Sequence, residues 1–241
     1  MKKVLLTAAA VFAFGFTNAQ EIKFGAKAGL NLSTIKATPP SINGAIVIAP
    51  DNKMAVGFHV GGFAEIGITE KFAFQPELLF SMEGSKFEAN ESGSETFGGD
   101  TYTYSDVNKT TVKTSYINIP LLAKFKATEK LFFVAGPQLG FLMSAKRDYT
   151  NTYSETFNGT TETETTSVNG VDIKKDLKGV NFALDLGAGY FFTDNIFAEA
   201  RYNIGLSNDA KEVKETFNGV EYSYQPVYKA SSIQISFGYK F

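Results

Sequence analysis

Eight segments of this sequence alternate apolar and polar side chains with a period of two, and no other feature constrains the fold as much. Period two is the repeat of a β-strand, in which successive side chains point to opposite faces of the sheet. In every segment one face is almost free of charged residues. The alternating segments cover approximately residues 22–33, 56–68, 72–83, 116–126, 131–146, 180–190, 196–207 and 232–241. The chain is therefore predicted to be all-β, with eight strands.

The connections between these segments are alternately short and long. Short turns lie at 69–71, 128–130 and 193–195, whereas long links cover 35–53, 88–110, 149–177 and 209–228. Short turns at one rim and long loops at the other are typical of outer-membrane β-barrels, whose short turns are periplasmic. The sequence thus predicts an eight-stranded antiparallel up-and-down transmembrane β-barrel with short periplasmic turns and long extracellular loops. A ten-stranded barrel is the alternative if one loop hairpin enters the membrane.

The apolar face distinguishes a membrane barrel from a soluble barrel of the lipocalin type. A soluble barrel would hold its apolar face inside and its polar face in water. Here the polar face is rich in glycine and small residues, which suits a crowded interior, and the apolar face is nearly free of charge, as lipid requires. The chain also ends in an aromatic residue, which resembles the signal that the barrel-assembly machinery of Gram-negative bacteria reads. The residues of this C-terminal signal are Phe237, Tyr239 and Phe241.

The first 19 residues are predicted to be a secretory signal peptide. Lys2 and Lys3 give a positive start, residues 4–16 are apolar, and cleavage is expected after Ala19. Residues 20–241 then form the barrel domain, in the outer membrane of a Gram-negative bacterium. This domain has 21 basic and 25 acidic residues, no cysteine and one histidine. That composition excludes cysteine-ligated and multi-histidine metal sites and provides no basic surface for nucleic acid.

The polar face of the predicted strands holds charges of both signs, which are predicted to pair inside the barrel. Eight strands enclose an interior just wide enough for side chains to fill. If the 193–195 turn is tight, Asp185 faces Asn203 and lies diagonal to Arg201, within reach of an ion pair. The predicted interior network consists of Lys23, Lys27, Glu65, Glu77, Glu83, Lys124, Lys126, Asp185, Glu199 and Arg201.

Catalysis is the less favoured interpretation of these polar residues. Outer-membrane hydrolases pair histidine with serine or aspartate, and the one histidine here, His59, lies on a polar face where an interior hydrogen-bonding role is commoner. Carboxylate pairs such as Glu77 with Glu83 share the interior with lysine and arginine, so salt bridges are expected instead of acid–base chemistry. No glycine-rich segment joins a strand to a helix, so no phosphate loop is expected. The sequence predicts no enzyme, no cofactor and no metal site.

Three prolines lie inside predicted strands, where each removes a hydrogen bond of the ladder. These are Pro76, Pro120 and Pro137. If the 128–130 turn sets the register, Pro120 pairs with Gln138 beside Pro137, and we expect a bulge or kink there.

Three of the long loops repeat Glu-Thr-Phe followed by Gly-Gly or Asn-Gly. The copies begin at Glu95, Glu155 and Glu215, sixty residues apart each time. Asn-Gly favours a type I′ hairpin turn, and the flanking threonines and tyrosines favour strands. The strands are therefore predicted to continue above the membrane as three hairpins. Shared ancestry of hairpin units is favoured over a dedicated ligand motif as the origin of the repeat.

The same three loops carry 14 acidic and 5 basic residues, a charge of −9, whereas the whole barrel domain has a charge of −4. Tyrosine adds a large, stiff contact area with a hydrogen-bonding end. We therefore expect the loops to bind a basic or cation-bridged partner, with association weakened by salt. The alternative is that they only keep the outer surface solvated. The candidate binding residues are Phe97, Tyr102, Tyr104, Tyr149, Tyr153, Phe157, Phe217, Tyr222 and Tyr224.

Five segments of the chain resemble the PorT-type outer-membrane β-barrel family, often labelled the porin family and common in Bacteroidetes. They are KFGAKAGLNLST (23–34), FQPELLFS (74–81), YINIPLLAKFK (116–126), FVAGPQLGFL (133–142) and ISFGYKF (235–241). The resemblance covers essentially all of residues 20–241. It implies an outer-membrane barrel without a known catalytic centre, and the family name also covers a component of a protein-secretion system.

Two classes of function follow from these features. The first is a non-enzymatic binding or structural protein of the outer membrane that acts through its acidic loops. The second is a small passive porin. The expected partners are outer-membrane lipid, the barrel-assembly machinery and an extracellular or secretion-complex protein.

Overall fold

The structure is a computed structural model that describes residues 22–38, 51–217 and 220–241. The signal peptide predicted for 1–19 lies outside the described residues, as do residues 39–50 of one predicted loop. In the described part of the chain, no helix has the length and apolarity to cross a membrane. The elements are β1 (Ile22–Thr38), β2 (Asp51–Gly67), β3 (Phe72–Phe97), β4 (Asp100–Lys126), β5 (Leu131–Phe157), β6 (Thr160–Asp172), the 3-10 turn η1 (Lys174–Asp176), β7 (Val180–Phe191), β8 (Ile196–Gly205), β9 (Val213–Phe217), β10 (Val220–Tyr224) and β11 (Val227–Lys240).

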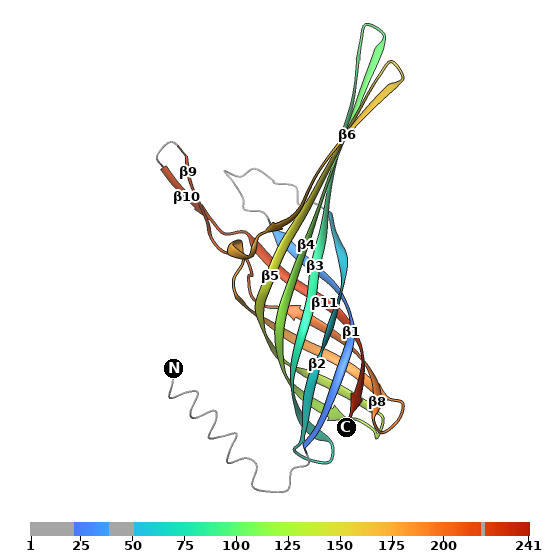
Figure 1. The fold of residues 1–241 in the computed structure, drawn as a ribbon, viewed down its shortest axis with the longest axis vertical. Coiled ribbons are helices and arrows are strands. Elements are labelled where there is room, and N and C mark those ends of the chain that lie inside the picture. Colours follow the sequence, from blue (N-terminus) through green and yellow to red (C-terminus); the bar gives the residue numbers. More distant parts are fainter. Residues whose placement is uncertain (1–21, 39–50, 218–219) are drawn as a thin grey trace.

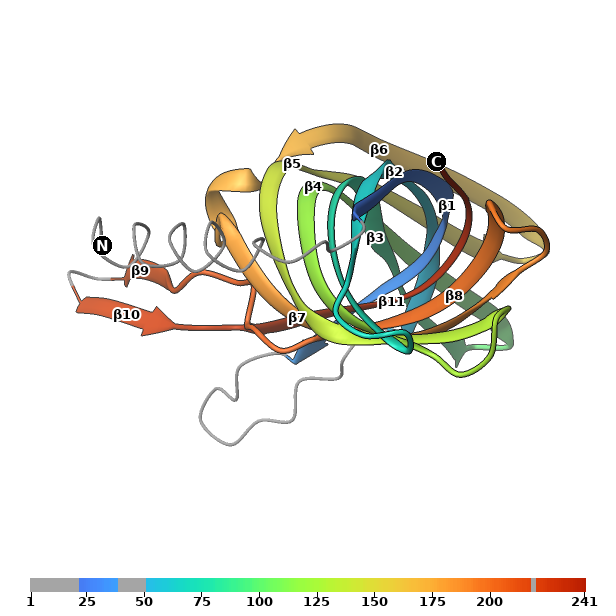
Figure 2. The same ribbon diagram turned by 90° about the horizontal axis from the view of Figure 1, so that it is seen from below.

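Eight of these strands form a closed antiparallel ring, in the order β1, β2, β3, β4, β5, β7, β8 and β11. The β4–β5 pairing completes the ring, and β11 pairs with both β8 and β1. Figure 2 looks along the barrel and shows the strands surrounding one interior. The predicted fold class is confirmed, and β6, β9 and β10 lie outside the ring.

The two rims of the barrel differ as the spacing of the segments predicts. Residues 68–71, 127–130 and 192–195 make short turns at one rim, which we assign to the periplasmic side. At the other rim, β3–β4 and β5–β6 project as long hairpins (Figure 1). Asn158 and Gly159 have φ angles of 48° and 78°, the left-handed values that a type I′ turn requires.

The third predicted hairpin differs from the expectation in one respect. β9 and β10 pair over Val213–Phe217 and Val220–Tyr224, but they form a separate two-stranded sheet and do not continue a barrel strand. The reason is that β8 ends at Gly205, and Asp209 and Ala210 then turn inward and are buried before β9 begins.

The outward face of the ring is apolar, as the alternation predicts. Phe24 and Phe237 expose 61% and 64% of their surface although each lies in a strand that is paired on both sides. Near the periplasmic rim, aromatic rings pair on this face, with centroids 5.0 Å apart for Phe72–Phe125 and 5.4 Å apart for Tyr239–Phe241. An aromatic girdle at the membrane interface is typical of such barrels.

The interior contains an apolar cluster that the sequence analysis did not predict. We call it the aromatic plug, and it lies at the periplasmic end, where the short turns are. Its rings stack edge to face and tilted, with centroids 5.2 Å apart for Phe132–Phe191 and 5.8 Å apart for Phe132–Phe197. The plug consists of Phe63, Leu122, Phe132, Val134, Phe191 and Phe197.

Three interior glycines provide the space for these rings. Each lies directly opposite a plug phenylalanine on the neighbouring strand: Gly25 opposite Phe63, Gly189 opposite Phe132 and Gly238 opposite Phe197. A Cβ placed on any of the three would collide with the facing ring. These three glycines therefore leave the space that the plug rings occupy.

Gly238→Ala is expected to destabilise the barrel by about 1–3 kcal/mol, because the Phe197 ring must move out of the packed plug. Chemical unfolding in lipid vesicles measures this change. Gly62→Ala is the matched control, since the nearest atom to a Cβ there is the Gly25 carbonyl oxygen at 3.4 Å. Equal midpoints for the two variants would contradict close packing around Phe197.

The prolines are accommodated differently from the predicted bulge. Pro120 does pair with Gln138, but the register is the same at Ile119–Leu139 and at Ala123–Ala135, so the bulge predicted there is wrong. Gly136 supplies the reason: without a Cβ it lets the Leu121 carbonyl of β4 approach closely. The register of β4 and β5 shifts instead between Ser115 and Tyr116, nearer the extracellular side.

Candidate functional site

Arg201 on β8 is the centre of the interior ion network. Its guanidinium lies 2.9 Å from Glu77, 2.6 Å from Glu199 and 3.4 Å from Asp185. Lys27 reaches the same two glutamates, at 2.7 Å from Glu77 and 3.2 Å from Glu199. All five side chains are almost wholly buried. Two cations are therefore shared among three carboxylates across β1, β3, β7 and β8, and Asp185 also accepts a hydrogen bond from Asn203.

A second cluster lies beside the plug and is joined to the first through Gln75. Lys124 is 2.7 Å from Glu65 and donates a hydrogen bond to the side-chain oxygen Oε1 of Gln75 at 3.1 Å, while the side-chain Nε2 of Gln75 donates to Glu77 at 2.8 Å. The Lys124 ammonium also lies 4.1 Å from the centroid of the Phe132 ring, a cation–π contact. The polar network and the aromatic plug are thus in contact and together fill the barrel interior.

The remaining predicted network residues occupy different positions. Lys126 contacts Glu65 at 3.0 Å but is one third exposed at the rim, and Lys23 is half-buried opposite Glu65. Glu83 lies apart from the cations of the network and accepts hydrogen bonds from Ser81 at 2.9 Å and Asn118 at 3.4 Å. The sequence analysis did not include Gln75 or Lys240 in the network, although both lie on the polar face.

Above the barrel, the projecting parts of β3, β4, β5 and β6 form a four-stranded sheet, which we call the arm (residues 88–110 and 149–168; Figure 1). The face that continues the barrel interior carries tyrosines and acids. The Tyr102 hydroxyl lies 2.9 Å from that of Tyr153 and donates to Glu155 at 3.1 Å. These interactions, with the Tyr153 bond foremost, raise the pKa of Tyr102, so the phenol stays protonated.

Acidic side chains gather on this inner face of the arm because the register of the four strands aligns them. Asn151 donates to Asp106 at 2.5 Å, and the Tyr149 hydroxyl donates to Asn108. Residues 88–108 and 150–167 contain no lysine or arginine. The acids of the inner face are Glu91, Glu95, Asp100, Asp106, Glu155, Glu162 and Glu164.

The outer face of the arm has a different chemistry. Its β5–β6 half consists of facing threonine and serine hydroxyls, which lie within 2.8–3.4 Å of one another across the strands. The facing pairs are Thr150–Ser167, Thr152–Thr165, Ser154–Thr163 and Thr156–Thr161. The arm is thus a two-faced sheet, acidic and tyrosine-rich inside and uncharged on this part of the outside.

The structure brings some of the predicted loop residues together and separates others. Tyr102, Tyr104, Tyr149 and Tyr153 share the inner face of the arm, and Phe157 is exposed at a hairpin tip. Tyr224 is half-buried on the separate β9–β10 sheet. The side chains of Phe97, Phe217 and Tyr222 lie outside the described part of the structure.

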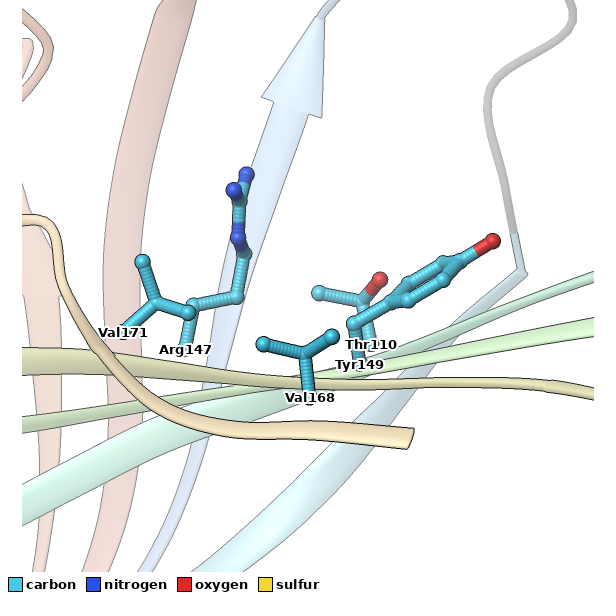
Figure 3. Close-up of a pocket in the computed structure, with 5 residues that line it drawn as sticks. All are labelled: Thr110, Arg147, Tyr149, Val168 and Val171. Carbon is cyan, nitrogen blue, oxygen red and sulfur yellow. The ribbon is translucent and has the colours of Figure 1, made fainter. Parts of the chain in front are cut away.

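A hollow of about 420 Å³ lies at the base of the arm (Figure 3). In Figure 3, Val168 lies between Arg147 and the Tyr149 ring, which extend in different directions. The hollow is lined by Thr110, Arg147, Tyr149, Val168 and Val171. The Arg147 guanidinium and the Tyr149 phenol thus lie beside apolar valine side chains at the extracellular end of the barrel.

The closed ring and its lipid-facing apolar surface agree with the comparison of the sequence with protein families. Residues 18–210 match the family described as "Outer membrane protein beta-barrel domain". The chain belongs to this outer-membrane β-barrel family. A comparison with curated protein sequences finds no match for this barrel.

Solved structures similar to this outer-membrane barrel include three bacterial proteins. Ail of Yersinia pestis has 12% identity over 92% of this chain and 99% of its own, with a TM-score of 0.37. OprG of Pseudomonas aeruginosa has 11% identity over 92% and 97%, with a TM-score of 0.40. The protease OmpT of Escherichia coli has 10% identity over 93% and 98%, with a TM-score of 0.35. Sequence identities and TM-scores this low carry no information about the function of this chain.

His59 lies inside this outer-membrane barrel in a serine–histidine–asparagine arrangement. Its Nε2 is 2.7 Å from the Ser236 hydroxyl, and its Nδ1 is 2.7 Å from the Asn31 amide oxygen. Serine hydrolases use a similar order of groups, with an acidic side chain in place of the asparagine. All three side chains are at most 1% exposed, however, and the Asn31 amide is also bonded to Ser81. A substrate has no access to Ser236, so the geometry fits an interior hydrogen-bond network.

Among the residues that the structure describes, no group of three or more histidine or acidic side chains is arranged to hold a metal ion. The acids of the arm follow the strands in rows and do not converge on one point.

Proposed function

We propose that this outer-membrane protein is a non-enzymatic binding or structural protein that engages a partner through its extracellular arm. The observation that carries the proposal is the inner face of the arm, where hydrogen bonds hold Tyr102, Tyr153 and Glu155 in fixed positions. Side chains held in place before binding lose less entropy when a partner arrives. Seven acids and no base on that face favour a basic or cation-bridged partner.

The filled interior favours binding over the alternative of a small passive porin. Ion pairs around Arg201 cross the middle of the barrel, and the aromatic plug occupies the periplasmic end. A solute would have to displace buried, paired charges to pass.

The resemblance to the PorT-type family adds a second candidate, a role in a protein-secretion complex. Such a role would use the barrel wall, the periplasmic turns or the arm. Removing the arm separates these possibilities.

Trimming the arm and the β9–β10 hairpin is expected to leave barrel assembly intact and to abolish the cellular interaction. An Asn-Gly turn replaces residues 90–107, 152–165 and 214–223, because the pairs Ala89–Asn108, Asn151–Thr166 and Val213–Tyr224 can each close a two-residue hairpin. Heat-modifiable gel migration reports assembly. Cross-linking to surface proteins, with and without added salt, reports the interaction.

A trimmed barrel that keeps full function in cells would contradict the proposal. The role would then lie in the barrel wall or on the periplasmic side, and the secretion role would gain support. Loss of assembly in the trimmed variant is addressed by trimming one hairpin at a time.

A further inference from the structure

The outward face of the barrel ends in lysine at the extracellular rim. In four strands a lysine lies four positions beyond an apolar outward residue, on the extracellular side, as Lys36 does beyond Leu32 and Lys86 beyond Met82. Four residues span about 14 Å along a strand, or roughly 10 Å along the membrane normal once strand tilt is included. This height corresponds to the headgroup layer above the hydrocarbon.

These lysines face one another in pairs. Lys36 lies directly opposite Lys229, Lys53 opposite Lys86, and Lys113 opposite Lys146. Like charges directly opposite on neighbouring strands are destabilising. The six residues come from six of the eight ring strands, and we call them the lysine girdle.

The acidic residues near the girdle neutralise only part of its charge. Lys53 pairs with Glu88, and Lys113 pairs with Asp148, each at 2.5 Å. In both pairs the lysine lowers the pKa of the carboxyl group, which stays ionised. The other four lysines, Lys36, Lys86, Lys146 and Lys229, are exposed and have no ion pair within 4.0 Å among the described residues, and Lys146 lies opposite Asp172 on its other side.

We propose that the lysine girdle binds the phosphate groups of lipid headgroups in the outer leaflet. A phosphate has several anionic oxygens and can accept hydrogen bonds from two facing ammonium groups at once, which turns each repulsive pair into a clamp. The level of the girdle at the end of the apolar band places it beside the headgroups. The acidic arm above it repels free anions, so the girdle faces the membrane. The opposite rim carries aromatic rings at the equivalent outward positions.

The test measures the stability of the full-length barrel in two kinds of vesicle. One contains phosphatidylcholine alone, and the other also contains diphosphorylated lipid A. In phosphatidylcholine, Lys36→Gln with Lys229→Gln is expected to leave the unfolding midpoint unchanged or to raise it, because a repulsive pair is removed. With lipid A, the same variant is expected to have a lower midpoint than the wild type. Lipid A binding should weaken roughly fivefold per lysine removed, the equivalent of about 1 kcal/mol.

Lys71→Gln with Lys130→Gln is the matched control, since it makes the same charge change in the periplasmic turns. It should behave as the wild type in both vesicles. Lys86→Gln repeats the test on a second facing pair, Lys53 with Lys86, and should likewise lower the midpoint only in vesicles that contain lipid A.

Three results would overturn the proposal. In the first, the girdle variant and the control lose lipid A binding equally. In the second, lipid A lacking its phosphates stabilises the wild type as much as the diphosphorylated form does. In the third, free inorganic phosphate reproduces the stabilisation, which would make the ligand a soluble anion. None of these results affects the proposed role of the arm.

Discussion

Arg201→Met is expected to cost the barrel about 3–5 kcal/mol of folding free energy. Arg201 and Lys27 are the two cations that pair with Glu77, Glu199 and Asp185 in an interior closed to solvent. Without the guanidinium, three buried carboxylates share one ammonium. The penalty is the desolvation of charge that no longer has a partner, which exceeds the net contribution of any one salt bridge.

Unfolding of the barrel in lipid vesicles by guanidinium chloride, followed by tyrosine fluorescence, measures this loss of folding free energy. Arg147→Met is the matched control, because Arg147 is the other arginine of the chain and is exposed at the arm. Arg201→Met combined with Glu77→Gln should recover part of the loss, since one unpaired charge is removed. A change below about 1 kcal/mol for Arg201→Met would show that water enters the interior and screens the network.

Phe132→Ala is also expected to reduce the free energy of unfolding by about 3–5 kcal/mol, in this case because a packed ring is removed. The ring packs against Phe191 and Phe197, lies on Gly189 and contacts the Lys124 ammonium. Its removal leaves a cavity that rigid strands cannot close. The neighbouring substitution Phe133→Ala is the control, because Phe133 points to lipid and is 46% exposed. Equal unfolding midpoints for the two variants would contradict a packed plug.

The filled interior predicts the electrical behaviour of the barrel. In planar bilayers, the wild type should show no steady conductance, because the aromatic plug and the ion pairs around Arg201 both block the interior. A steady, large conductance of the wild type would contradict a filled interior and would favour the passive porin.

Much of the fold is predictable because its determinants are local. Alternation with a period of two assigns each side chain to a face, and short turns fix the register of the strands that they join. The pairing of Asp185 with Asn203, and hence the approach of Asp185 to Arg201, follows from the length of one turn. The Glu-Thr-Phe repeats likewise indicate hairpins because Asn-Gly determines its own turn geometry.

The parts that could not be predicted depend on several strands at once. Phe132 and Phe197 interrupt the polar pattern of their strands, and only the assembled ring shows that they meet over glycines. Gln75 joins two charge clusters through contacts with β4 and within β3 that no single segment reveals. The lysine girdle likewise depends on registers between strands, such as the pairing of Lys36 near one end of the chain with Lys229 near the other.

The pairing of β1 with β11 also has a consequence for the order of folding. Every hairpin forms between neighbours in the sequence, but this seam joins the first strand of the barrel to the last. Contacts between distant residues form slowly, because the entropy of a long intervening chain is lost before the contact is made. Closure of the seam is therefore expected to be the last and slowest step. Until the seam closes, the facing edges of β1 and β11 are unpaired and open to pairing with another chain. The strand β11, which bears Phe237 and Tyr239, must therefore be protected until it pairs with β1.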